Sequence, residues 1–143
     1  MPQPPRRPFR AQQGRKPAPP SGNKPPSAKD RGWDPVAAWY DKLVGESGSD
    51  YHQNVILPAA LRMLAPQPGE SVIDVCCGQG VLIRPLLEAR IGKFTGVDAS
   101  PRLIESAKTR YAGDTRISLV VADACKPGRW VDGMNDAATC IMA

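Results

Sequence analysis

The sequence predicts a doubly wound parallel α/β sheet, preceded by a helical segment and a long polar arm. From residue 70 onward, short apolar runs rich in β-branched residues alternate with amphipathic segments, as in parallel strands joined by helical crossovers. Residues 32–69 show only helical periodicity, and residues 1–31 hold almost no large apolar side chain. We therefore expect an arm over 1–31, a helical cap segment over 32–69 and a cofactor-binding half-domain over 70–143.

Residues 1–31 are expected to form a disordered arm. They contain 9 of the 16 prolines, and only Met1 and Phe9 are large and apolar, so burial cannot offset the entropy of folding. Eight basic residues against one acidic residue give the arm a net charge of +7, whereas 11 basic and 13 acidic residues give the rest −2. We interpret the arm as a solubilising tail, and weak contact with nucleic acid or ribosomes is the alternative.

The first helix is predicted to begin at Asp34 as N-cap, with Pro35 at the first helical position. It should end before Gly45, in the turn-forming stretch GESG. Its apolar residues recur with the helical period and form one stripe that is expected to face the core. The stripe comprises Val36, Trp39, Tyr40, Leu43 and Val44.

A second helix is predicted over YHQNVILPAALRMLA, with Ser49 or Asp50 as its cap. Pro58 should kink or restart this helix, because proline lacks the backbone donor that a regular helix needs. One face of the helix carries apolar residues and is expected to be buried: Leu57, Ala60, Leu61 and Leu64.

The remaining chain has the strand and helix order of a Rossmann-like domain. Ser100 and Pro101 provide an N-cap and a first helical residue for the second of its helices. In order, the predicted elements are strand 71–77, helix 81–90, strand 93–99, helix 100–111, strand 117–124 and strand 136–143.

Three acidic residues lie at or near the carboxyl ends of these strands, where open α/β sheets bind ligands. They are Asp74, Asp98 and Asp123. Asp98 follows Gly78 by 20 residues, the spacing at which a carboxylate accepts hydrogen bonds from ribose hydroxyls. Gly78 and Gly80 allow a tight turn with the backbone against a ligand. The sequence therefore predicts a pocket for an adenosine.

The charge of the glycine loop indicates which adenosine compound is bound. A dinucleotide site needs a third glycine where Ile83 stands, and a helix N-terminus free of anions. Asp74 would repel a pyrophosphate, but it suits a ligand with ammonium and sulfonium charges. The expected cofactor is S-adenosylmethionine.

VIDVCCGQG (72–80) resembles the first motif of class I S-adenosylmethionine-dependent methyltransferases, a hydrophobic run followed by D/E-x-G-x-G-x-G. FTGVDAS resembles the second motif, VVADA the third, and NDAATCIMA the fourth strand. The upstream helices resemble the cap segment of the branch that includes ubiquinone and menaquinone biosynthesis enzymes. The resemblance covers residues 70–143 in order and spacing.

The resemblance implies a role for each matching residue. Asp74 and the backbone of Gly78, Gln79 and Gly80 would hold the methionine part. Asp98 would bind the ribose hydroxyls. The remaining family positions fall near the adenine: Ala99 and Ser100 would flank it, Asp123 would accept from its amino group, and Ala124 would offer its backbone N–H.

Cys76 stands where the family has its first glycine, and it should fit if its φ is negative, although it narrows the space near the cofactor. Cys77 is expected to pack as a small apolar side chain. The ligand spacing does not favour a metal site built from Cys76, Cys77, Cys125 and His52. His52 is more simply a surface or packing residue than a base or substrate ligand, and Tyr40 and Tyr51 are core residues or, alternatively, a lid.

The function expected from the sequence is methyl transfer to a small molecule. The chain ends in or just after the fourth of about seven strands that the family has, so this strand should be left with an unpaired apolar edge. The alternative is a truncated, non-catalytic cofactor-binding or interaction module with a basic tail. No apolar run approaches the roughly 18 residues of a membrane span, and a cytoplasmic location is expected. The acceptor, any catalytic base and the oligomeric state stay open at this point.

Overall fold

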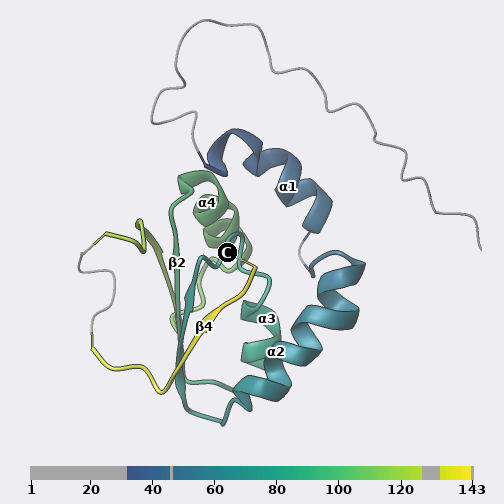
Figure 1. The fold of residues 1–143 in the computed structure, drawn as a ribbon. Helices are drawn as coiled ribbons and strands as arrows, with labels where there is room; N and C mark the ends of the chain where they lie inside the picture. The colour runs from purple at the N-terminus through teal and green to yellow at the C-terminus, as the bar shows by residue number, and fades with distance from the viewer. Residues whose placement is uncertain (1–31, 46, 127–132, 143) are drawn as a thin grey trace, which may run out of the picture.

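The computed structural model describes residues 32–45, 47–126 and 133–142. The predicted arm, residues 1–31, lies outside this part of the chain. Four strands pair in parallel, in the order β3-β2-β1-β4, with helices packed against them (Figure 1). The strands are β1 (Ser71–Val75), β2 (Lys93–Asp98), β3 (Ile117–Val121) and β4 (Ala137–Cys140). The predicted parallel α/β fold is confirmed.

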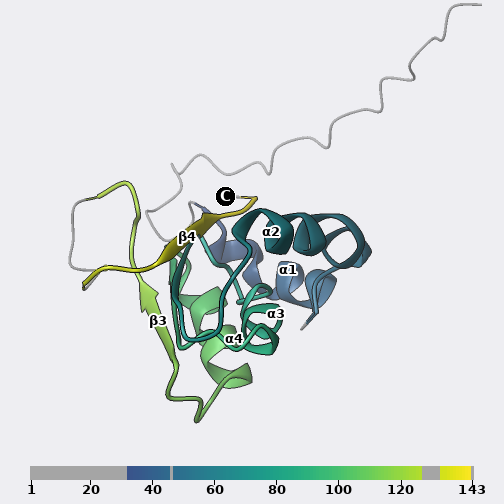
Figure 2. The ribbon, with the colours of Figure 1, turned by 90° about the horizontal axis from the view of Figure 1, so that it is seen from below.

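The helices of the α/β part are α3 (Ile83–Glu88) and α4 (Pro101–Arg110). The predicted start of α4 is confirmed: Pro101 is its first residue, and the Ser100 Oγ accepts a hydrogen bond from the Leu103 N–H at 3.3 Å. Within the described residues, all labelled helices lie on one side of the sheet (Figure 2). The main core lies between them and β1 and β2; its fully buried members are Val72, Leu82, Ile83, Leu86, Ile91 and Phe94.

The first helical segment begins as a 3-10 turn, η2 (Asp34–Val36), and continues as α1 (Ala37–Val44). The predicted capping role of Asp34 in its own helix is wrong, because no side chain caps the start of η2. Instead, the Asp34 Oδ1 accepts from the Ser100 Oγ at 2.8 Å and from the Arg102 N–H at 3.2 Å. A long-range contact with the start of α4 therefore takes the place of the predicted local cap.

The predicted apolar stripe of α1 is also wrong in part. Trp39 is 63% exposed and Leu43 is 58% exposed, whereas Ala37 and Val44 are buried. The face turned inward also carries Asp41, which pairs with Arg110 at the end of α4. The small Ala37 side chain and this ion pair bring α1 against α4, and that contact decides which face is buried.

The second helical segment is interrupted as predicted. A π-turn, η3 (His52–Ile56), precedes α2 (Leu57–Leu64), with Pro58 in the first turn of α2. Proline cannot donate to the carbonyl four residues earlier, and the wider turn allows the Leu57 N–H to reach the His52 carbonyl. The predicted apolar face of α2 is confirmed, since its four apolar residues are partly buried and pack on the main core.

Candidate functional site

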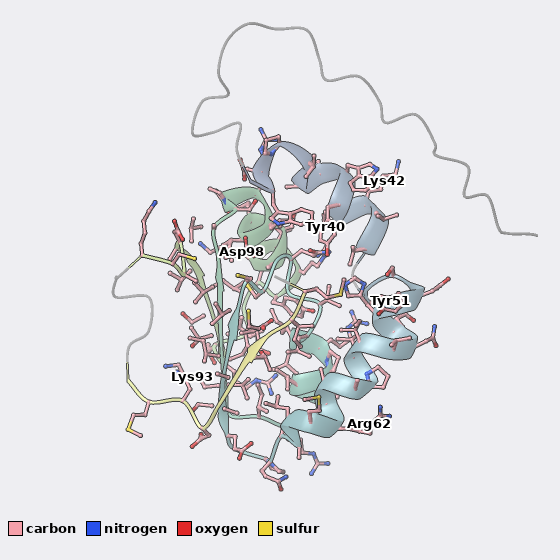
Figure 3. The ribbon with its side chains drawn as sticks, viewed as in Figure 1. Tyr40, Lys42, Tyr51, Arg62, Lys93 and Asp98 are labelled. Atoms are coloured by element: carbon pink, nitrogen blue, oxygen red, sulfur yellow. The ribbon has the colours of Figure 1, made fainter. Side chains whose placement is uncertain are left out.

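Two adjoining pockets open at the carboxyl ends of the strands, next to α1. We call them the Asp74 pocket and the Asp98 pocket. Their common lining residues are Tyr40, Cys76, Gly78 and Met142. Tyr40 and Asp98 lie at this end of the sheet, whereas Lys93, at the start of β2, lies at the other (Figure 3). The carboxyl end of the sheet thus forms one continuous two-part site.

Asp98 ties the glycine loop to the end of β2. Its Oδ2 accepts a hydrogen bond from the Gly78 N–H, and its Oδ1 accepts from the Ser100 N–H, both at 2.8 Å. The side chain is 9% exposed. Each carboxylate oxygen has a second lone pair, so Asp98 can still accept from a ligand in its pocket. The 20-residue spacing seen in the sequence corresponds to a direct contact.

Asp74 places a second carboxylate at the end of β1. It is 4% exposed, and its Oδ1 accepts a hydrogen bond from the Thr139 Oγ1 at 2.7 Å. Burial raises the pKa of Asp74 to about 6, and the nearby Asp98 charge adds to this, while the Thr139 bond opposes it. At pH 7 the pocket therefore holds a largely ionised, poorly solvated carboxylate, which favours a cationic ligand.

The glycine loop is held from outside by α4. The Arg110 Nη1 donates to the Gln79 carbonyl at 3.2 Å, and the Tyr111 hydroxyl donates to the Gly80 carbonyl at 3.3 Å. Gly80 has φ +83°, and a Cβ on it would lie 2.5 Å from the Ile83 Cδ1. Glycine is therefore required where the loop enters α3.

The Gln79 side chain provides a buried donor without a partner. Gln79 is 2% exposed and lines the Asp74 pocket, and within the described residues its Nε2 has no acceptor. A buried amide without a hydrogen bond costs about 1–3 kcal/mol, so a ligand acceptor would satisfy it. From the sequence, only the backbone of Gln79 was expected to bind the cofactor.

Cys76 was expected to fit in place of glycine if its φ were negative, but its φ is +62°. A side chain with this backbone conformation is strained by roughly 1–2 kcal/mol, and the preference for glycine at this position is therefore conformational. Cys77 is buried, and its sulfur lies against Gly96. Burial strongly raises the pKa of the Cys77 thiol, which agrees with the prediction that it packs as a small apolar side chain.

The structure brings together most of the predicted site, but not all of it. Asp123 forms an ion pair with Lys126 at 3.0 Å and accepts from the Cys125 N–H at 3.0 Å. Neither Asp123 nor Ala124 is among the residues that line the two pockets, and Gly80 and Ser100 support the site from behind. The predicted residues that do line the pockets are Asp74, Cys76, Gly78, Gln79, Asp98 and Ala99.

Aromatic and imidazole groups from the helical segment also line the pockets. Tyr40 lies between them, in ring contact with Trp33 at 5.1 Å, and burial and the Asp98 charge raise the pKa of Tyr40. His52 lines the Asp74 pocket with its Nδ1 2.8 Å from the Ser49 Oγ, and burial lowers the pKa of His52. Tyr51 lines neither pocket.

Several lining residues were not predicted as part of the site, and Trp33 and Met142 are two of them. Met142 lies two residues beyond β4, at the carboxyl end of a strand next to β1. The rule that ligands bind beyond strand ends could have found it. No comparable sequence signal marks Trp33.

Metal and membrane features are not found in the described part of the chain. Its His, Cys, Asp and Glu side chains form no group of three that could hold a metal ion. None of its helices combines the length and apolar character needed to cross a bilayer.

Residues 72–143 match the protein family described as "Methyltransferase domain". The match covers half of the chain, so the chain belongs to this family, among the class I S-adenosylmethionine-dependent methyltransferases.

Among curated relatives, the mRNA cap guanine-N(7) methyltransferase 1 of Arabidopsis thaliana is 36% identical over 58 residues, covering 41% of this chain and 16% of the relative. The 2-phytyl-1,4-naphtoquinone methyltransferase of Nostoc sp. is 32% identical over 80 residues, covering 54% of this chain and 34% of the relative. The chain thus spans about a third or less of these relatives. A solved methyltransferase from Thiobacillus denitrificans, in complex with S-adenosyl-L-homocysteine, is 25% identical with a TM-score of 0.52, covering 61% of this chain and 36% of that one.

Proposed function

We propose that the two-part site binds S-adenosylmethionine and that the whole protein transfers its methyl group to an acceptor. The supporting observation is the joined pair of pockets, each with a buried carboxylate, at the carboxyl ends of β1 and β2. The Asp74 pocket suits the charged amino-acid end of the cofactor, and the Asp98 pocket suits the ribose and adenine. The complex of the Thiobacillus denitrificans relative with S-adenosyl-L-homocysteine supports this proposal.

The donor set fits this cofactor. The Asp74 carboxylate would pair with the ammonium group, and the unpartnered Gln79 Nε2 would donate to the carboxylate. Asp98 would accept from the ribose hydroxyls with the lone pairs that Gly78 and Ser100 leave available. These assignments extend the family resemblance to side-chain atoms of this chain.

The adenine would occupy the far end of the Asp98 pocket. Ala99 and the apolar side chains of Trp33 and Leu103 line that pocket. Asp123 remains a candidate partner of the adenine amino group, with Ala124 beside it. To take this role, Asp123 would have to exchange its contact with Lys126 for the base.

Bound S-adenosylmethionine would supply an electrophilic methyl group on its sulfonium sulfur. The chain would contribute alignment and exclusion of water. Asp74 and Asp98 would fix the two ends of the cofactor, while Tyr40 and Met142 would cover the middle, where the pockets meet.

His52 is the candidate proton acceptor on the acceptor side. It lines the Asp74 pocket, and with its Nδ1–H donated to the Ser49 oxygen, its Nε2 would carry a free lone pair. The lowered pKa keeps the ring neutral at pH 7. An acceptor that loses a proton on methylation could transfer it to this nitrogen.

We propose a small molecule as the acceptor. The walls of the Asp74 pocket near His52 are apolar, formed by Ile56, Leu57, Val81 and Ile141. Such a lining suits a compact organic acceptor. The naphtoquinone relative supports this assignment, whereas the mRNA cap relative makes RNA the other candidate.

Titration calorimetry with S-adenosylmethionine tests the binding proposal. We expect saturable binding, weakened roughly 10- to 150-fold by Asp98→Ala, the value of about 1.5–3 kcal/mol for hydrogen bonds to a charged acceptor. Asp114→Ala is the matched control, because Asp114 pairs with Arg116 away from the pockets. No saturable binding by the folded protein would contradict the proposal, and unchanged affinity in Asp98→Ala would overturn the ribose assignment.

Transfer of a radiolabelled methyl group tests the acceptor. Label from S-adenosylmethionine is followed into small-molecule and RNA fractions of a cell extract. Label in the small-molecule fraction is expected, and label in RNA would move the acceptor to nucleic acid. Binding without transfer to either fraction would support the non-catalytic alternative.

A further inference from the structure

Two cysteines that are distant in the sequence lie at the ends of neighbouring strands, beside the site. Cys140, the last residue of β4, lies opposite Val75, the last residue of β1, and Cys76 comes next along the chain. Burial, and then the neighbouring Cys140 side chain, raise the pKa of Cys76. Both are free thiols, Cys140 exposed and Cys76 half-buried.

The geometry suits a covalent link between the two. Neighbouring strands run about 4.8 Å apart, and Cys76 lies one residue, about 3.3 Å, beyond the partner of Cys140. The expected Cα separation is therefore roughly 6 Å, within the range of roughly 4.4–6.8 Å that a disulfide needs. Cys77, the neighbour of Cys76, is buried with its sulfur against Gly96, and therefore does not compete for the same partner. We propose that Cys76 and Cys140 are a redox modification site, converted to an intramolecular disulfide by a disulfide oxidant such as glutathione disulfide.

The reaction balances in two exchange steps. The exposed Cys140 thiolate attacks the oxidant, which breaks its S–S bond, forms a mixed disulfide and releases one glutathione thiolate. The Cys76 thiolate then attacks the protein sulfur of the mixed disulfide and releases the second glutathione. Two protein thiols lose their protons and are oxidised, and one oxidant disulfide is reduced to two thiols.

One of the two cysteines lies in the walls of the site, and the other adjoins them. Cys76 lines both pockets, and Cys140 directly precedes Ile141 and Met142, which line the Asp74 pocket. A Cys76–Cys140 bond would fix the loop after β1 to the chain leaving β4. This consequence rests on the proposed function: a cofactor lying over Cys76 would shield it from the oxidant, and the disulfide would in turn alter cofactor affinity.

Oxidation of the full chain with glutathione disulfide at pH 8 tests the modification site. We expect two of the four thiols to be lost, with a mass decrease of two hydrogens and no glutathione adduct. Peptide mapping should then join the segments that contain Cys76 and Cys140. The rate should increase with pH, because each exchange step needs a thiolate. The pKa of Cys76 is raised by burial, by Cys140 and by the Asp98 and Asp74 charges, so few of its thiols are ionised at neutral pH.

Matched variants separate this pairing from others. Cys125→Ser, at an exposed cysteine outside both pockets, should leave the reaction unchanged. Cys140→Ser should form no intramolecular disulfide. Loss of two thiols in Cys140→Ser would overturn the proposal in favour of the neighbours Cys76 and Cys77. Persistence of all four thiols in the folded parent protein, or stable glutathione adducts without an intramolecular disulfide, would also overturn it.

The shielding effect is tested by repeating the oxidation with saturating S-adenosylhomocysteine. We expect the disulfide to form at least about 10-fold more slowly. The disulfide could instead form equally fast while calorimetry shows that the ligand is bound. This result would support the Cys76–Cys140 pair but would contradict the placement of Cys76 under the cofactor. A disulfide in a protein that binds no S-adenosylhomocysteine would support the modification site and refute only the proposed function.

Discussion

At the scale of single residues, Asp74 shows how burial gives the site its charge preference. Its carboxylate has one hydroxyl partner, from Thr139, and its pKa is raised to about 6. Burying this negative charge costs stability that the fold tolerates. A ligand with an ammonium group at this position would offset that cost, so the same feature that weakens the fold would strengthen binding.

The raised pKa of Asp74 predicts a pH dependence of stability. The pKa of Asp74 in the folded protein, about 6, lies above the ordinary value of 3.8. Between these two pH values the folded state therefore binds one more proton than the unfolded state. Stability should therefore fall as pH rises from about 4 to 6, by up to roughly 3 kcal/mol, and change little outside this window. Urea denaturation across this range measures it, and Asp74→Asn should remove this contribution. An identical pH dependence in Asp74→Asn would contradict the assignment.

Binding of S-adenosylmethionine should have the opposite pH trend. The ionised Asp74 is the form that attracts the cationic ligand, so affinity should increase as pH rises through about 6. Calorimetry at pH 5 and pH 7.5 should give a clear difference for the parent protein and a smaller one for Asp74→Asn. Equal differences in both proteins would assign the trend to other groups.

The strained backbone of Cys76 predicts a stabilising substitution. Cys76→Gly should raise the free energy of unfolding by about 1 kcal/mol, because glycine adopts a φ of +62° without a Cβ clash. Cys76→Ala is the matched control, since it removes the same thiol but keeps the Cβ. Chemical denaturation of both variants measures the difference, and an equal gain in both would attribute the effect to the thiol.

At the scale of helices, α1 and α4 together hold the glycine loop. Arg110 joins Asp41 of α1 to the carbonyl of Gln79. The loop therefore depends on a side chain from the far end of α4. The hydrogen bonds of Asp34 with Ser100 and Arg102 hold η2 at the start of the same helix, so both ends of α4 are joined to the helical segment.

Replacing Arg110 should affect both stability and binding. Arg110→Gln should lower the free energy of unfolding by about 1–3 kcal/mol, because it leaves the partly buried Asp41 without its cation. It should also weaken S-adenosylhomocysteine binding by loosening Gln79. Denaturation and calorimetry measure the two effects. Arg116→Gln, which breaks an exposed pair with Asp114, should leave both unchanged, and equal losses in the two variants would refute the role of Arg110.

The two helices of the cap segment show what could be predicted from the sequence. The predicted apolar face of α2 was correct because its leucines contact the core directly, and hydrophobic periodicity reports such contacts. The predicted inward face of α1 was wrong in part, because Ala37 and the Asp41–Arg110 pair decide the orientation of this helix. Periodicity cannot detect an ion pair between residues far apart in the sequence.

Asp98 and Asp123 likewise differ in how well their positions could be predicted from the sequence. The spacing of Asp98 from the glycine loop reflects a hydrogen bond across two neighbouring strands, so the sequence contained its position. Asp123 was placed by family resemblance at the end of β3, where in the structure the local pair with Lys126 holds it outside both pockets. Local polar partners of this kind leave no periodic signal.

At the scale of the whole molecule, the site joins distant parts of the chain. Tyr40 comes from the helical segment, Cys76 and Gly78 from the loop after β1, and Met142 from beyond β4. A ligand that contacts all of them would link the helical segment to the ends of β1 and β4. Binding should therefore stabilise the described fold as a unit.

This linkage predicts a shift in thermal unfolding. S-adenosylhomocysteine at 100 times its dissociation constant should add about 2.7 kcal/mol to the free energy of unfolding and raise the midpoint by roughly 5–15 °C. Differential scanning calorimetry with increasing ligand measures it. Adenosine at the same concentration should give a smaller shift, because it leaves the Asp74 pocket unfilled and therefore binds more weakly. No ligand-dependent shift would contradict binding to the folded state.

The π-turn before Pro58 also sets the angular phase of the residues that precede it. One additional residue in a helical turn rotates the upstream chain by about 100° around the helix axis. In the present phase, His52 and Ile56 line the Asp74 pocket, while Tyr51 is exposed. Pro58 lines neither pocket, yet by enforcing the wider turn it selects which upstream side chains the acceptor would meet. A change at this one position could therefore exchange the lining of the pocket without altering any residue within it.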